Sequence, residues 1–279
     1  MARLIGRVFL ENKMAVVGVV IIIVMVLFSF IGPLIYKTDQ ITPNLLLLNN
    51  APSGQHLFGT DDQGYDLLGR VMKGGQASLE VGLAAAAVAT LLGVIWGAVA
   101  GFFGGVVDAV MMRIVDVVLS IPGLLLLITL AVILQPGELI LIFIIAALAW
   151  LYPARLVRGE TLTLRTREYV QAVRVMGGSG RRIVLRHIIP NAVGTIVVNA
   201  TFQVADAILT LAALSFLGLG IQAPNTDWGQ ILSNGSGQLP NPYWWEIVFA
   251  GIAITLVVVA FNFIGDALRD SLEVRLQRR

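Results

Sequence analysis

Apolar runs of membrane length alternate with polar segments along the chain. About 20 helical residues cross the roughly 30 Å hydrocarbon layer of a bilayer. The first run, from Met14 to Ile35, is longer than the apolar part of a cleaved signal peptide, and Gly32-Pro33 is not a small-residue cleavage site. The pattern predicts an all-α polytopic membrane protein with six transmembrane helices. The expected spans are residues 14–35, 79–103, 106–134, 139–156, 193–217 and 245–264.

The positive residues between the spans predict the orientation of the chain. Lys and Arg accumulate on the cytoplasmic side of membrane proteins. With the N-terminus inside, 16 of the 19 Lys and Arg residues fall on the inner side, and both termini are then cytoplasmic. We expect a cytoplasmic N-terminus at 1–13, an extracytoplasmic loop at 36–78 and a cytoplasmic tail at 265–279. Residues 79–264 are expected to form a five-helix membrane core. This core includes the cytoplasmic loop 157–192 and the extracytoplasmic loop 218–244.

The composition supports a membrane protein and removes several classes of chemistry. Hydrophobic residues make up 57% of the chain and charged residues 13%, whereas a soluble domain carries about 25% charged residues. Cysteine is absent, which excludes disulfides and thiolate metal sites. No basic patch carries the interleaved aromatic residues of a nucleic-acid surface. We therefore expect lipid, and no nucleic acid, around this chain.

Metal and nucleotide binding also lack their usual motifs. The two histidines, His56 and His187, fall on opposite sides of the predicted membrane, so they do not form one cluster. The acidic stretch from Asp61-Asp62 to Asp66 lacks the later bidentate Glu of an EF-hand. No G-x-x-x-x-G-K-[ST] phosphate loop occurs. We expect no metal site, no cofactor and no catalytic residue in this chain.

The polar insert of residues 157–192 is unusually basic. Eight of the 19 Lys and Arg residues lie between Arg155 and Arg186. Such a segment between two spans faces the cytoplasm. It is either a docking element for a soluble partner or a solvated loop with the ordinary positive charge of the inner side, and composition leaves both open.

The middle of this insert predicts two helices joined by a tight turn. Residues 168–176 favour a helix with an acidic residue in its first turn. Gly177-Gly178 ends that helix, and Ser179 can cap a second one. The second helix is expected to stop near Pro190, where the backbone N–H is missing.

Three polar residues share one face of the fifth span. Asn199, Gln203 and Asp206 stand at i, i+4 and i+7, which places them together on a helix. They either line an aqueous path or form hydrogen bonds between helices.

Small and charged residues in the second and third spans suggest helix contacts. Gly93, Gly97 and Gly101 recur at every fourth position, which permits close approach of another helix, within this chain or in a partner. Asp116 follows Arg113 by one turn, so we expect these two side chains to pair.

A series of short motifs runs in order from residue 56 to residue 270. They are H-L-F-G-T-D (56–61), G-G-V-V-D (104–108) with Arg113 and Asp116, S-I-P (120–122), A-R-L-V-R (154–158), E-Y-V-Q-A-V-R-V-M-G (168–177), I-V-L-R-H-I-I-P-N (183–191), L-S-F-L-G-L-G (214–220), W-G (228–229) and N-F-I-G-D-A-L-R-D (262–270). Together they resemble the C-type permease subunit of dipeptide and oligopeptide ABC importers.

The resemblance implies the type I ABC-importer permease architecture and a non-catalytic role. In that family two homologous permease subunits form one pathway in the bacterial cytoplasmic (inner or plasma) membrane. Two ATP-binding subunits hold ATP and Mg, and an extracytoplasmic binding protein delivers peptide. By position, Glu168, Ala172, Gly177 and Pro190 correspond to the loop that couples the permease to an ATPase.

Some positions depart from the family pattern. The family often has Glu where Gln171 stands and Ala where Val173 stands, and many relatives carry Glu near Leu211. The motifs also fit permeases for nickel chelates, glutathione or antimicrobial peptides. A self-sufficient secondary carrier predicts inverted repeats and paired charges within the membrane, and neither is clear in this chain.

Overall fold

The computed structural model describes residues 9, 11–134, 137–237 and 243–277, with side chains up to residue 272. Within these ranges every regular element is helical, apart from one isolated bridge between Thr60 and Asp66. The elements are α2 (Lys13–Val26), a π-helical turn (Leu27–Ile31), α3 (Gly32–Ile35), α4 (Leu67–Phe103), α5 (Gly105–Leu119), α6 (Gly123–Leu134), α7 (Glu138–Ala149), α8 (Leu151–Leu164), α9 (Glu168–Val175), α10 (Gly180–Ile183), a second π-helical turn (Val184–Ile188), α11 (Ile189–Phe216), α12 (Trp228–Gly237) and α13 (Trp245–Gln277).

Four to six helical units have the length and apolar composition to cross a membrane. Four are single runs, at residues 13–35, 67–103, 180–216 and 245–272. The other two are bent pairs: α5 and α6 meet at 81°, and α7 and α8 at 45°. The expected six spans are reached when each bent pair counts as one span.

Several boundaries differ from those expected. Helix α4 begins at Leu67 rather than residue 79, because Asp66 caps it by accepting the amide N–H of Gly69 at 3.0 Å. Its 37 residues extend about 55 Å, well beyond the hydrocarbon layer. Helix α13 continues to Gln277 through the expected tail. Residues 1–8 and 10 of the expected N-terminal segment and residues 238–242 of the expected loop 218–244 lie outside the described residues.

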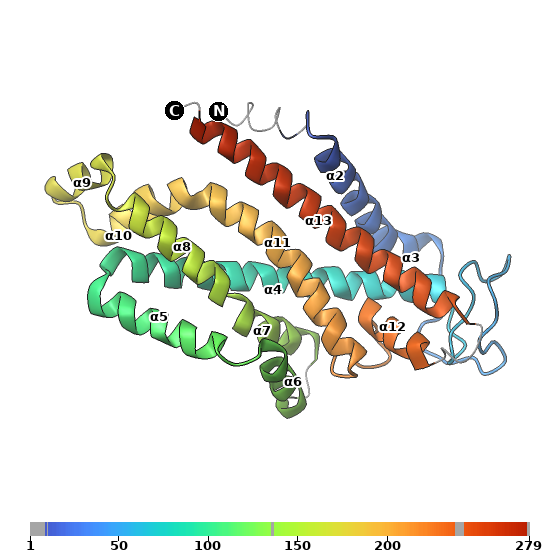
Figure 1. Ribbon diagram of the computed structural model, residues 1–279. Helices are drawn as coiled ribbons and strands as arrows, with labels where there is room; N and C mark the ends of the chain where they lie inside the picture. Colours follow the sequence, from blue (N-terminus) through green and yellow to red (C-terminus); the bar gives the residue numbers. More distant parts are fainter. Residues whose placement is uncertain (1–8, 10, 135–136, 238–242, 278–279) are drawn as a thin grey trace.

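The helices form a bundle around α4 (Figure 1). One buried cluster joins α4, α11, α12 and α13, and a second joins α4, α6, α7 and α11. Helix α2 packs along α13. Helices α9 and α10 lie at one end of the molecule, and residues 37–66 lie at the opposite end.

The glycine face of α4 packs against α8. A Cβ at Gly93 would come within 2.5 Å of Cβ of Pro153, and one at Gly101 within 2.8 Å of the carbonyl oxygen of Arg158. The backbones of the two helices therefore touch, and only glycine fits between them. These glycines serve packing within the chain.

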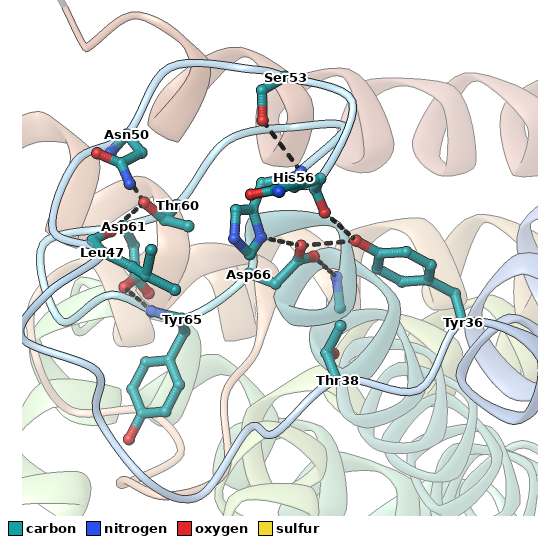
Figure 2. Close-up of polar contacts among 12 residues, drawn as sticks. Tyr36, Thr38, Leu47, Asn50, Ser53, His56, Thr60, Asp61, Tyr65 and Asp66 are labelled. Carbon is teal, nitrogen blue, oxygen red and sulfur yellow. Dashed lines mark hydrogen bonds and ion pairs between the residues drawn. The ribbon is translucent and has the colours of Figure 1, made fainter.

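Residues 37–66 form an ordered cap around the start of α4 (Figure 2). One carboxylate oxygen of Asp66 accepts the hydroxyl of Tyr36 and lies 2.8 Å from Nδ1 of His56. Partial burial, and then the bond to Asp66, raise the pKa of Tyr36 to about 12. The motif His56–Asp61 thus builds the cap that fixes the first turn of α4.

Candidate functional site

Helix α9 ends in a left-handed turn at Gly177, as the sequence predicts. The amide N–H of Gly177 donates to the carbonyl of Arg174 at 3.0 Å, and that of Gly178 donates to the carbonyl of Val173 at 2.9 Å. This pair of bonds defines a Schellman motif. Gly177 has φ +80°, a conformation that costs a residue with a Cβ roughly 1–2 kcal/mol. The turn therefore depends on glycine.

The stretch after this turn caps the next helix. Oγ of Ser179 accepts the amide N–H of Arg182 at 3.4 Å, which confirms the predicted cap.

Pro190 lies inside a continuous helical run, which corrects the prediction that it ends the second helix. Residues 180–216 form one run of 37 residues. Directly before the proline, the amide N–H of Ile189 donates to the carbonyl of Val184, five residues back, in a π-helical turn. The extra residue of that turn lets the helix pass the missing N–H. Pro190 is exposed in the first turn of α11.

One side of α9 is attached to the rest of the molecule. Val170 is buried in a small apolar cluster with Ile183 and Ile188. The side-chain amide of Gln171 donates to the carbonyl of Arg165 at 3.0 Å, near the end of α8. A Glu carboxylate, which the resemblance leads us to expect at this position, has no proton to donate there. Gln171 therefore ties α9 to α8.

The other side of α9 is exposed at the end of the molecule (Figure 1). Val175 and Met176 are 88% and 77% exposed. Glu168 and Ala172, two of the predicted coupling residues, are exposed on the same short helix. Large apolar side chains presented at a protruding helix end are suited to contact with another protein.

Two ion pairs join α8 to α5. Arg158 binds Asp108 with both Nε and Nη2, the latter at 2.6 Å from Oδ2, and such bidentate pairs fix geometry. Arg155 binds Asp116. The structure thus corrects the expected pairing of Asp116 with Arg113. Because α8 leads directly into α9, these pairs connect the protruding helix with α5.

Gln203 occupies a different position from the two polar residues near it. It is buried, and its side-chain amide donates to the carbonyl of Ala149 at the bend between α7 and α8. In an unbroken helix that carbonyl would accept the N–H of residue 153, but Pro153 has none. Gln203 therefore supplies the missing donor. This agrees with the expectation that the polar residues of this span form hydrogen bonds between helices.

Asn199 and Asp206 do not share this contact. Asp206 is exposed and Asn199 is partly buried, and Oδ1 of Asn199 has no hydrogen-bond partner among the described residues. The structure does not gather the three predicted lining residues into one contact. A pathway-lining role stays a prediction for these two.

Replacing Gln203 with Leu is expected to destabilise the bend. The partly buried carbonyl of Ala149 loses its donor, which costs about 1–3 kcal/mol. Thermal unfolding of the detergent-purified chain measures this loss of stability. Pro153→Ala restores a backbone N–H, so the double variant should recover most of it. Gln222→Leu, at an exposed residue with only a local bond, is the control. An equal loss of thermal stability in Gln203→Leu alone and in its double variant with Pro153→Ala would contradict this role of Gln203.

Two family models together match most of the chain. Residues 1–52 match the N-terminal transmembrane domain of oligopeptide transport permease C. Residues 93–278 match the binding-protein-dependent transport system inner membrane component. The chain belongs to this family of inner membrane components.

Curated members of the family align with the chain over nearly its full length. The oligopeptide transport system permease protein OppC of Bacillus subtilis is 41% identical over 97% of this chain and 88% of its own length. The dipeptide transport system permease protein DppC of the same organism is 39% identical over 96% and 84%. OppC of Haemophilus influenzae is 39% identical over 96% and 86%.

The part shared with the inner membrane component family contains α9 and both ion pairs. The match begins at Gly93, within α4, and runs through α13. Sequence reasoning placed Glu168 and Gly177 on the segment that forms α9 and its turn, but it missed the contacts of α8. The Arg and Asp residues that form them were visible in the sequence, but they lie 39 and 50 positions apart, so no local spacing reveals the pairing.

Proposed function

We propose that this chain is a permease subunit of an ATP-driven peptide importer. Relatives about 40% identical over nearly the whole chain carry the names of oligopeptide and dipeptide transport permeases. By this proposal the chain forms half of a translocation pathway with a homologous second permease. An extracytoplasmic binding protein supplies the peptide, and two ATP-binding subunits hold ATP and Mg. The chain itself is not an enzyme.

The observation that carries the proposal is the protruding helix α9. It presents exposed apolar residues at one end of the molecule and is attached by its other side to α8 and α10. An ATP-binding subunit that holds this helix can move α8. The ion pairs that Arg155 and Arg158 form with aspartates of α5 then pass the movement to α5. Movement of packed helices of this kind is a common means of switching a protein between two states.

The proposal fixes an orientation and a number of spans. The two bent helix pairs count as the third and fourth of six spans, and α9 and both termini are cytoplasmic. Residues 37–66 and α12 then lie outside the bacterial cytoplasmic membrane. Asp206 and Asn199 face the pathway between the two permeases, which accounts for an exposed carboxylate on α11.

Reconstitution tests the proposal. The chain is co-expressed with the permease, ATP-binding and binding-protein genes of its own gene neighbourhood, and the purified complex is placed in lipid vesicles. We expect ATP-dependent uptake of a labelled short peptide that stops when the chain is omitted. Uptake that needs a proton or sodium gradient and no ATP would contradict the proposal and favour a secondary carrier.

A further inference from the structure

Phe102 lies where the end of α4 meets the loop that carries α9 and α10. Its side chain is partly buried and packs against the apolar cluster of Val170, Ile183 and Ile188. A Cβ at Gly180, the first residue of α10, would come within 2.8 Å of Cε1 of Phe102. The backbone at the start of α10 therefore rests directly on the aromatic ring, and glycine permits this close approach.

Helix α9 contacts the same ring through a positive charge. The guanidinium carbon of Arg174 lies over the ring of Phe102, 5.7 Å from its centroid. At such a distance the negative face of an aromatic ring attracts a cation. Arg174 is in the last turn of α9, directly before the exposed Val175 and Met176. The ring is thus in contact with the end of α9 that is free to meet a partner.

Arg165, the residue that follows α8, caps the end of α4. Its Nη1 donates to the carbonyl oxygens of Gly101 and Phe102 at 2.8 and 3.4 Å. Both carbonyls belong to the last turn of α4, where backbone acceptors have no donor within the helix. A cation is also favourable at this end of a helix dipole. The end of α8, together with α9 and α10, therefore meets α4 within its last turn.

Helix α4 connects this contact with most of the bundle. It contributes residues to both large apolar clusters, the one with α11, α12 and α13 and the one with α6, α7 and α11. The ion pairs of Arg155 and Arg158 lead to α5 instead. We propose that Phe102 and Arg165 form a second coupling joint, through which movement of α9 is passed to α4.

The joint rests on the proposed function and adds a second route to the one through α5. Phe102 acts in it as a positioning residue, because it keeps α4 in step with the loop. Close-packed contacts transmit displacement, since protein interiors have low compressibility. Without the ring, a void separates α4 from α10, and α9 moves through part of its path before α4 follows. ATP hydrolysis is then no longer matched by transport.

Reconstituted vesicles that contain the complete complex test the joint, because peptide uptake and ATP hydrolysis are measured in the same sample. For Phe102→Ala we expect uptake of a labelled short peptide per ATP hydrolysed to fall about fivefold. The rate of ATP hydrolysis should stay close to that of the wild type. Arg165→Met removes the two bonds to the end of α4 and should lower the same ratio independently.

Two further variants separate coupling from folding. Phe102→Met refills most of the space with a flexible apolar side chain and should restore most of the ratio. Phe103→Ala, at the neighbouring aromatic residue that is 66% exposed, is the matched control and should leave the ratio unchanged.

The outcomes distinguish the joint from the proposed function. The joint is overturned if the variants at positions 102 and 165 that assemble keep the wild-type ratio. It is also overturned if uptake and ATP hydrolysis fall in parallel, since a purely structural loss has that effect. A wild-type complex without ATP-dependent uptake would contradict the proposed function itself, and the joint with it.

Discussion

Replacing Gly177 with Val is expected to reduce ATP-coupled uptake strongly while the chain still inserts into the membrane. Gly177 has φ +80° and carries one of the two bonds that end α9. A β-branched residue in this conformation costs roughly 1–2 kcal/mol or more. Because α9 has only eight residues and is held by a few contacts, chiefly those of Val170, Val173 and Gln171, that strain is enough to disrupt its last turn. We expect uptake to fall at least about tenfold, since 1.4 kcal/mol corresponds to a factor of ten.

Gly177→Asn is the matched control. A Cβ at position 177 would meet no atom within 4 Å, so the effect of Val comes from backbone strain and not from a clash. Asn adopts the left-handed conformation more readily than other residues and should retain most of the uptake. Equal uptake by the Val and Asn variants, at equal amounts in the membrane, would show that the conformation of this turn does not matter.

Reversing the charge of Asp108 is expected to have the second large effect. Asp108→Arg removes a bidentate pair and sets two guanidinium groups against each other between α5 and α8. Loss of hydrogen bonds to charged groups costs about 1.5–3 kcal/mol each. We expect a lower Tm in detergent and strongly reduced ATP-coupled uptake, because α8 no longer moves with α5.

A charge-swapped double variant distinguishes the effect of losing the ion pair from the effect of changing either residue alone. Arg158→Asp alone should fail in the same way, and the double variant with Asp108→Arg should recover much of both Tm and uptake, since the pair forms again in reverse. A double variant no better than the worse single variant would mean that Asp108 and Arg158 act independently.

The periodicity of the chain was sufficient to predict an all-helical membrane fold and the protruding helix α9. Long apolar runs and the basic segment 157–192 predict the spans and α9, and Gly177 and Ser179 mark the turn correctly because helix caps depend on local residues. Hydropathy placed the start of α4 too late, because its first turns carry Arg70 and Lys73. The structure buries Arg70 against Asp61 and the carbonyl of Pro224.

Contacts between distant elements account for what the sequence did not reveal. Pro190 is a helix breaker by local rules, but the preceding π-helical turn carries the helix past it. Asn199, Gln203 and Asp206 share a face in sequence, yet only Gln203 meets the bend created by Pro153. Each of these outcomes depends on what packs beside the residue, and a single sequence does not contain that information locally.

The central claim is that α9 contacts an ATP-binding subunit, and site-specific photocrosslinking tests it most directly. The chain has no cysteine, so Val175→Cys gives one site for a maleimide-benzophenone probe on the exposed end of α9. Leu46→Cys, at a residue that is 92% exposed in the cap at the opposite end of the molecule, is the control. In membranes that contain the co-expressed ATP-binding subunits, we predict a crosslink to such a subunit from position 175 and none from position 46. No such crosslink from position 175, or an equal one from position 46, would contradict the account.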